Sequence, residues 1–232
     1  MKEYMFSLGY DAVVQLKPHE VKLAIFWRRH VFELCWSEER SRVLIAELKA
    51  SRAQFYVINA HLEGSPWRAS DRVSQIRHAL HRLEYHVEMM RESAHLAIRN
   101  ANVIVAGDFN STDKDAPCTF LRQGHLPAGF TDPNPPGQAP ATTNDIHHPF
   151  QFVDVYKEAH AVPPFTRKVS HRGGARLDFV WVTSGIGIEA VLRPLPLEHR
   201  DLVHRLGLPN HALPSDHLPV GAVVSIPNTN TL

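Results

Sequence analysis

The chain has 232 residues, of which 44% are apolar and 21% are charged, values typical of a soluble globular protein. Its 25 Lys and Arg residues almost balance its 24 Asp and Glu residues, and the resulting net charge of +1 excludes a global basic field that draws the protein to nucleic acid or membranes. Any polyanionic ligand must therefore meet a local patch of charge.

The cysteine content and the first residues of the chain indicate the cellular compartment in which the protein is expected. Cys35 and Cys118 are too few for a disulfide framework, which favours a reducing environment. The start of the chain, MKEYMFSLGYDAVV, holds Lys2 and Glu3 and no long apolar run, so we expect neither a signal peptide nor an anchor. We expect an intracellular, cytoplasmic protein with no membrane contact, folded as a single domain over residues 1–232.

Short apolar runs rich in Val, Ile, Phe and Tyr predict β-strands, several of them buried on both faces. In chain order, the predicted strands cover residues 22–28, 42–49, 54–62, 102–109, 176–183, 188–192 and 219–226. The Pro-rich and Asn-rich stretch 131–150 and the stretch 199–217 are predicted to be irregular. Within the first of these, His147 and His148 are expected at a loop surface.

One long helix is predicted between the third and fourth strands. Its apolar positions recur in steps of three and four, which places them on one stripe: Val73, Ile76, Leu80, Leu83, Val87, Met90, Ala94 and Ala97. We expect Met89 and Met90 in the core. The other positions are expected to face solvent, and they include Arg72, Arg77, Arg82 and Arg91 as well as His78, His81, His86 and His95.

Polar residues stand at the ends of the predicted strands: His61 in NAHL, Asp108 and Asn110 in VAGDFN, Asp178 in RLDF, and Asp216 and His217 in PSDHLP. Taken singly, each has a plainer interpretation, such as a surface histidine, a turn, or a buried carboxylate paired with an arginine. Together, three carboxylates, two imidazoles and an amide can hold a hard divalent cation, contact phosphate and orient a water. Phosphodiester hydrolysis needs these functions, so we expect the six residues to converge in one cleft.

The motifs NAHL, GDFN, RLDFVW and SDHLP, in this order, resemble those of the endonuclease/exonuclease/phosphatase superfamily, which has the DNase I-like fold. Their surroundings, HLEGSPWRASDRVSQIRHAL, GDFNSTDKDAPCTFL, HPFQFVDVY and LPNHALPSDHLPVGAVV, are similar to its deadenylase-like branch, which includes nocturnin, angel and the catalytic subunit of the Ccr-Not complex. The resemblance extends from about Gly9 to Val224. It implies an α+β fold, a two-sheet β-sandwich flanked by helices.

The resemblance also implies roles at the scissile phosphate. Asp108 would position or deprotonate the attacking water and contribute to metal binding. Asn110 would hold the scissile phosphate, and His61 would contact it from the opposite side.

The same resemblance implies a second group of roles. His217 would bind the phosphate and stabilise its developing charge, and Asp178 would fix the tautomer and orientation of that imidazole. Asp216 would hold the metal directly or through water. The implied ion is Mg²⁺, or Mn²⁺ in its place.

One departure from the family pattern concerns its first strands. The pattern opens with a strand ending in Asn and a strand carrying Gln-Glu, whose Glu is the principal magnesium ligand, whereas EYMFSLGYDAVV matches only the stretch around the later Gly-Tyr. Glu3 stands six residues before Gly9 and on a helix, so we do not assign it as this ligand. We expect an N-terminally incomplete domain that lacks the first strands, binds Mg²⁺ weakly, and is completed by a missing N-terminal segment or a partner chain.

A second departure concerns the substrate. In poly(A)-specific members an aromatic ring shortly before the Asp of RLDF stacks on adenine, but here Gly173, Gly174 and Ala175 precede it. Phe165 and His171 are candidate substitutes for this ring, but neither stands at the matching place. Because stacking is worth about 1–3 kcal/mol per base, this segment argues against poly(A) specificity.

The leading hypothesis is therefore a Mg²⁺-dependent phosphodiesterase, of the 3′–5′ exoribonuclease type, acting on RNA. One alternative is a catalytically impaired or non-catalytic module that binds phosphate-bearing ligands. Another is a hydrolase of a small nucleotide or lipid phosphate ester.

Overall fold

A six-stranded mixed sheet forms the centre of the molecule. The computed structural model describes residues 2–16, 23–51, 53–90, 98, 100–169, 173–193, 195 and 199–227. The strand order is β3-β4-β5-β6-β12-β9, and only the pair β5–β6 is parallel. The strands are β3 (Glu33–Arg40), β4 (Val43–Ala50), β5 (Ala53–His61), β6 (Val103–Asp108), β9 (Phe152–Asp154) and β12 (Asp178–Thr183).

The continuous apolar runs of the sequence form the interior of this sheet. All of β12 and most of β4 are buried, because other layers cover both faces of the sheet. The four strands predicted at 42–49, 54–62, 102–109 and 176–183 are confirmed, with small shifts of their ends. The edge strand β3 was not predicted, since most of it is exposed and it carries no alternating apolar pattern.

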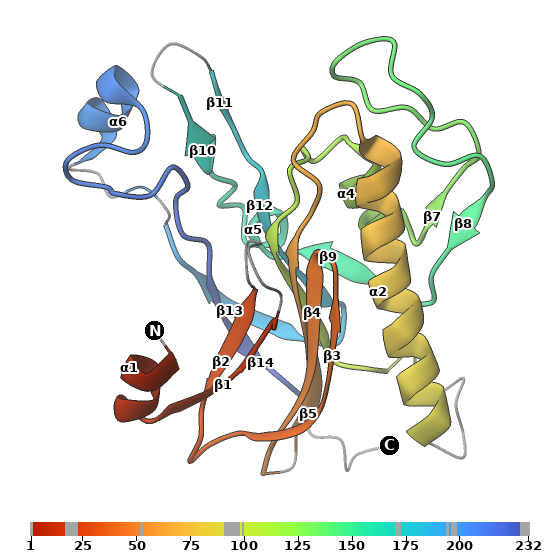
Figure 1. Cartoon of the computed structure of the whole chain (residues 1–232), viewed down its shortest axis with the longest axis vertical. Coiled ribbons are helices and arrows are strands. Elements are labelled where there is room, and N and C mark those ends of the chain that lie inside the picture. The colour runs from red at the N-terminus through yellow and green to blue at the C-terminus, as the bar shows by residue number, and fades with distance from the viewer. Residues whose placement is uncertain are drawn as a thin grey trace.

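Helices cover one face of the sheet (Figure 1). The predicted long helix is α2 (Ala69–Met90), which makes the crossover that the parallel strands β5 and β6 require. Its residues Val73, Ile76 and Leu80 are buried in one core with Ile58 and Val105 of the sheet. The helix α4 (Ala116–Gln123) packs beside it. Residues 91–97 of the predicted helix lie outside the described residues.

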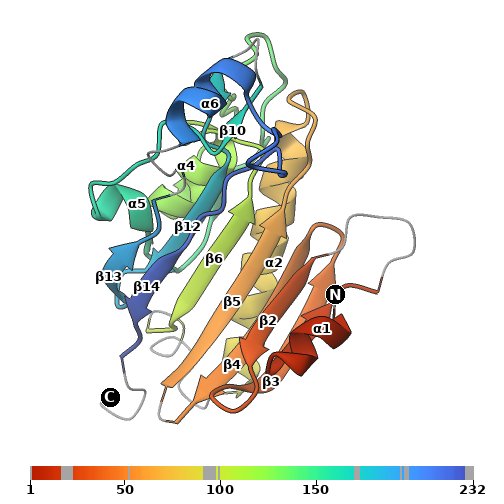
Figure 2. The same ribbon diagram turned by 90° about the vertical axis from the view of Figure 1, so that its left-hand side faces the viewer.

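Two separate pairs of strands form a second layer on the opposite face (Figure 2). Strand β1 (Tyr10–Val14) pairs with β2 (Ala24–Arg28), and β13 (Gly187–Val191) pairs with β14 (Ala222–Ser225). The first pair packs on β4 and β5, and the second packs on β12 and α5 (Val155–Glu158). The predicted α+β sandwich with flanking helices is thereby confirmed.

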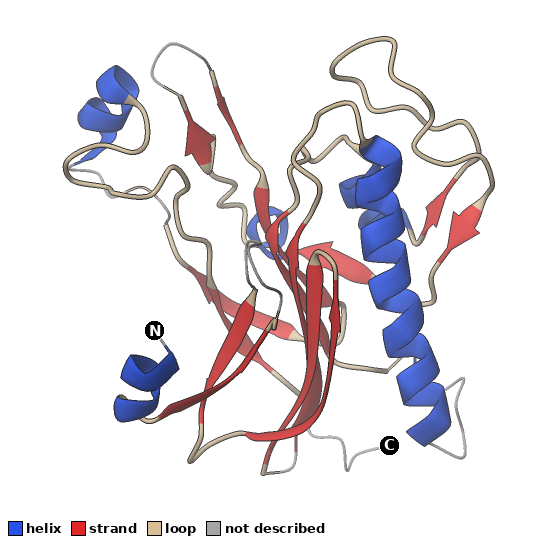
Figure 3. Ribbon diagram, viewed as in Figure 1, coloured by secondary structure: helices blue, strands red, loops and turns tan. Residues whose placement is uncertain are grey.

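Short elements and loops extend beyond the sheet (Figure 3). They are α1 (Lys2–Ser7), β7 (His125–Leu126), β8 (Ile146–His147), β10 (Arg167–Lys168), β11 (Gly174–Ala175) and α6 (Arg200–Leu206). The helix α6 corrects the prediction that 199–217 is irregular. Among the helices described, none is both long enough and apolar enough to cross a bilayer.

Three side-chain predictions on α2 are wrong. Arg72 is 2% exposed rather than solvated, and its Nη2 lies 3.0 Å from Oδ2 of Asp132. His86 is packed against the sheet, where its ring stacks on Trp36 with centroids 3.9 Å apart. Met89 and Met90 are exposed because the buried stripe of the described helix ends at Val87.

Candidate active site

Three predicted site residues lie in one row across adjacent strands. His61 ends β5 and Asp108 ends the parallel strand β6, and the two are partners in the register of this pair. Asp178 begins β12, which is antiparallel to β6, and it is the register partner of Asp108. The ends of two parallel strands and the start of an antiparallel strand meet at the same edge of the sheet, which brings together residues distant in sequence.

Gly107 allows this row to form. Its φ is +136°, and a Cβ there would lie 1.9 Å from the carbonyl oxygen of Ala60 on the neighbouring strand. Only glycine fits such a close approach of two backbones. The glycine of GDFN therefore has a structural reason that is separate from the chemistry of Asp108.

Two imidazoles face the carboxylate of Asp108. Its Oδ2 lies 3.6 Å from Nε2 of His61 and 3.9 Å from Nε2 of His217, and its Oδ1 accepts a 2.8 Å hydrogen bond from the N–H of Asn110. Burial raises the pKa of Asp108; the Asn110 N–H opposes this rise, and the nearby charge of Asp178 adds to it. A carboxylate with a raised pKa is a stronger base once it is ionised.

His217 is oriented by Asp178. Nδ1 of His217 lies 2.8 Å from Oδ2 of Asp178, and this hydrogen bond raises the pKa of His217 against the opposing effect of burial. The bond places the Nδ1 proton toward Asp178, so Nε2 faces Asp108. The family resemblance implied this pair, and the two side chains are hydrogen-bonded in the structure, while their catalytic roles stay a prediction.

Thr166, which sequence reasoning missed, connects the segments that carry this pair. Its Oγ1 accepts hydrogen bonds from the backbone N–H groups of Leu177 and Asp178, at 3.0 and 3.1 Å. Its carbonyl oxygen accepts the N–H of Leu218, at 2.7 Å. A threonine after a Pro-Pro-Phe segment gives no sequence signal for such a role.

The remaining two predicted residues differ in their placement. Asn110 adopts φ +45° and donates from Nδ2 to the carbonyl oxygen of Leu62, which joins the loops that follow β5 and β6. The side chain of Asp216 is 63% exposed, and its carboxylate lies 3.9 Å from Nε of Arg167. Asp216 is therefore near the site through its neighbour His217, but its carboxylate is not part of the row.

The described residues include one group that could hold a metal ion, Asp108, Asp178 and His217, with ligand atoms within 4.8 Å of one another. Mg²⁺ usually binds through one or two carboxylates together with water and substrate phosphate. The two carboxylates of the row satisfy that requirement. Because Oδ2 of Asp178 is already hydrogen-bonded to His217, Asp108 is the main candidate ligand for the ion. The donor set thus fits a hard divalent cation.

One end of the central sheet thus gathers carboxylates, imidazoles and an amide, a set that can hold a hard divalent cation and contact phosphate. The chain belongs to the endonuclease/exonuclease/phosphatase family, whose model matches residues 9–217. The resemblance drawn from NAHL, GDFN, RLDFVW and SDHLP is confirmed.

Relatives with curated names include nucleases and phosphodiesterases. The CCR4-Not complex 3′-5′-exoribonuclease subunit Ccr4 of Candida albicans is 28% identical over 174 residues, which cover 74% of this chain and 22% of that protein. The human 2′,5′-phosphodiesterase 12 is 28% identical over 91% of this chain and 38% of its own length. The chain spans only a fraction of the length of these relatives.

Solved structures show the same fold. ANGEL2, a 2′,3′-cyclic phosphatase, matches with a TM-score of 0.75 at 19% identity, over 95% of this chain and 75% of that one. The human Nocturnin catalytic domain matches with a TM-score of 0.65 at 16% identity, over 97% and 76%. Both belong to the deadenylase-like branch that the sequence resembles.

Proposed function

We propose that this protein is a metal-dependent phosphodiesterase that hydrolyses RNA from its 3′ end. The observation that carries the proposal is the row His61, Asp108 and Asp178 at one edge of the sheet, with His217 bonded to Asp178. The names of the exoribonuclease relatives support RNA as the substrate.

Each side chain of the site has a separate role in the proposed hydrolysis. The carboxylate of Asp108 accepts a proton from, or orients, the water that attacks phosphorus. His61 and Asn110 hold the phosphate on either side. His217, whose hydrogen bond to Asp178 raises its pKa and favours the doubly protonated ring, donates a hydrogen bond from Nε2 to the phosphate oxygen on which charge develops.

We further propose that Asp108 and Asp216 hold a Mg²⁺ or Mn²⁺ ion, with Asp216 acting directly or through water. The bound ion would neutralise charge on the phosphate oxygens. Because the side chain of Asp216 is exposed, its carboxylate is accessible for such a role.

The segment before Asp178 favours RNA without a preference for adenine. Gly173 and Gly174 offer no ring, and Phe165 is 5% exposed and packs directly on Gly174, so its faces are not open to a base. His171 lies outside the described residues. The named activities of the human phosphodiesterase and of ANGEL2 favour a small phosphate ester as the second candidate substrate.

We also propose that a further segment, from an N-terminal part of this protein or from a partner chain, completes the second layer. In the described residues β1 and β2 pair only with each other, as do β13 and β14. Strands β5 and β6 run between these pairs (Figure 2). Their apolar side chains Val57, Ile104 and Ala106 are only half-buried. Open edges beside an apolar face favour the addition of extended strands.

The decisive experiment is 3′ trimming of a 5′-labelled RNA by the protein with added Mg²⁺ and by the variant Asp108→Asn. We expect Asp108→Asn to lower the rate by at least about 10²-fold, the usual contribution of a general base. Asp11→Asn on β1 makes the same chemical change far from the row and should leave the rate unchanged. Equal trimming by Asp108→Asn would refute the proposal.

Two further measurements separate the alternatives. A panel of oligo(A), mixed RNA and phosphorylated nucleotides distinguishes an RNA substrate from a small ester. Calorimetric titration with Mg²⁺ addresses the non-catalytic alternative, because absence of both a metal site and hydrolysis would support a module that only binds.

A further inference from the structure

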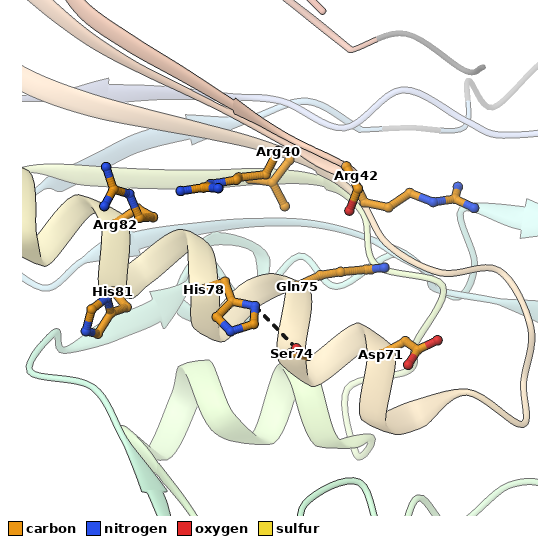
Figure 4. Close-up of a pocket in the computed structure, with 10 residues that line it drawn as sticks. Arg40, Arg42, Asp71, Ser74, Gln75, His78, His81 and Arg82 are labelled. Carbon is orange, nitrogen blue, oxygen red and sulfur yellow. Dashed lines mark hydrogen bonds between the residues drawn. The ribbon is translucent and has the colours of Figure 1, made fainter. Parts of the chain in front are cut away.

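A polar groove of about 510 Å³ lies between the β3–β4 turn and the first half of α2 (Figure 4). Its lining residues share a polar or basic character, apart from one valine: Arg40, Ser41, Arg42, Val43, Asp71, Ser74, Gln75, His78, His81 and Arg82. The strand side supplies Arg40 and Arg42, and the helix supplies the two histidines and Arg82. None of the lining residues is aromatic apart from the histidines.

Cations predominate in this lining. Three arginines line the groove against one carboxylate, that of Asp71. The side chains of Arg40, Arg42 and Arg82 are 49%, 36% and 38% exposed, so all three are reached by solvent. Glu38 and Glu63 contact these arginines from outside the lining, so the groove offers a polyanion exposed guanidinium N–H donors rather than a large excess of positive charge.

Glu38 holds two of these arginines in place. Its carboxylate lies 2.9 Å from Nε of Arg82 and 2.5 Å from Nη2 of Arg40. A guanidinium has five N–H donors, so a contact through one nitrogen leaves others for a ligand. Fixed side chains also lose less conformational entropy when a ligand binds.

The groove lies next to the row of His61, Asp108 and Asp178, because the β3–β4 turn that lines the groove contacts the end of β5. The backbone N–H of His61 donates to the carbonyl oxygen of Arg42, at 3.0 Å. The side chain of Arg42 reaches toward the loop after His61, with Nη2 3.5 Å from Glu63, and the N–H of Glu63 donates to Gln75 at 2.9 Å. A chain leaving the row over His61 therefore meets Arg42 first and then the groove.

We propose that this groove binds the phosphodiester backbone of the RNA substrate, on the 5′ side of the scissile bond. The proposal rests on the proposed function, since it takes the 3′ end of the RNA to lie at Asp108. Arginines contact phosphates without regard to sequence, and the absence of Phe, Tyr and Trp from the lining provides no platform for base stacking. The groove thus supplies affinity for longer RNA without base preference.

The test compares RNA lengths in an Asp108→Asn background, which slows hydrolysis during the measurement. Fluorescence anisotropy gives Kd for a 3-nucleotide and a 12-nucleotide RNA of mixed sequence. We expect the 12-mer to bind more tightly, and the double variant Arg40→Gln/His78→Gln to reduce this advantage by about 5–10-fold. The slope of log Kd against log salt for the 12-mer should fall by about 0.7, the value for the one guanidinium–phosphate contact that is lost with Arg40.

Arg77→Gln/His160→Gln is the matched control, because it removes the same residue types at exposed positions outside the groove. Equal losses in the control and groove variants would overturn the proposal, as would equal Kd values for the two RNAs in the parent protein. Competition by inorganic pyrophosphate without any dependence on RNA length would assign the groove to a small anion instead. Each of these results would leave the proposed function intact, provided that 3′ trimming still depends on Asp108. If the parent protein neither binds the two RNAs nor trims RNA, both proposals are refuted.

Discussion

The carboxylate of Asp178 lies 2.8 Å from Nδ1 of His217, although 39 positions separate the two residues in the chain. The strand β12 holds the carboxylate in the row, while His217 approaches from the segment that precedes β14. The imidazole therefore has a fixed orientation and a raised pKa before substrate arrives, and a donor fixed in advance is the requirement for electrostatic stabilisation of a developing charge.

Asp178→Asn should lower kcat by about 10²–10⁴-fold, because a neutral amide no longer raises the pKa of His217 and so no longer favours the doubly protonated ring from which Nε2 donates. His217→Gln should cause a loss of similar size. If the two residues act as one unit, the double variant will lose little more than either single variant. Steady-state kinetics on one RNA checks this, and losses that multiply would show that the residues act independently.

Thr166→Val should reduce both stability and activity. Valine has nearly the same shape but cannot accept the N–H groups of Leu177 and Asp178, and these would be left unsatisfied in a fully buried place. We expect unfolding free energy to fall by about 1–3 kcal/mol and kcat to fall with it. Thr166→Ser, which keeps the acceptor, should recover most of both in urea unfolding and kinetics. A Ser variant as impaired as the Val variant would contradict this role.

The sequence predicts the site better than it predicts the surroundings of the site. NAHL, GDFN and RLDF each combine an apolar run with a terminal polar residue, so the strand ends that carry His61, Asp108 and Asp178 could be located without coordinates. Their convergence follows from the order and direction of three strands, which the sequence pattern does not give and the structure does. The catalytic roles themselves stay predictions.

Other features depend on partners that no local pattern reveals. Arg72 stands at a position where an arginine normally faces water, and only the fold shows that Asp132 neutralises it from 60 residues away. His86 is likewise placed by Trp36 and Glu47 of two neighbouring strands. The strand β3 escaped prediction because an exposed edge strand does not need an apolar face.

Asp132→Ala should be one of the most destabilising substitutions in the protein. It removes the partner of Arg72 when both side chains are at most 2% exposed, and it removes the acceptor for the N–H of Ala116. Breaking such a buried pair costs about 3–5 kcal/mol. Asp71→Ala, which breaks the exposed pair with Arg68, should cost about 0–1 kcal/mol. Similar losses for the two variants in chemical unfolding would show that the buried pair is not the cause.

His148 should make the protein lose stability between neutral and mildly acidic pH. It is predicted from sequence at a loop surface, but it is half-buried, with Nε2 3.0 Å from the carbonyl oxygen of Phe120, and burial lowers its pKa from 6.5 to about 4. The unfolded chain therefore binds more protons between these values, so the contribution of His148 to stability is present above pH 6.5 and is lost as the pH falls toward 4. The loss at pH 4 is about 3 kcal/mol at most, since one pKa unit corresponds to about 1.4 kcal/mol.

His148→Gln keeps a donor for Phe120 but cannot titrate, so its unfolding free energy should depend less on pH over this range. Identical pH profiles for the parent and His148→Gln in urea unfolding would show that other groups control the acid response.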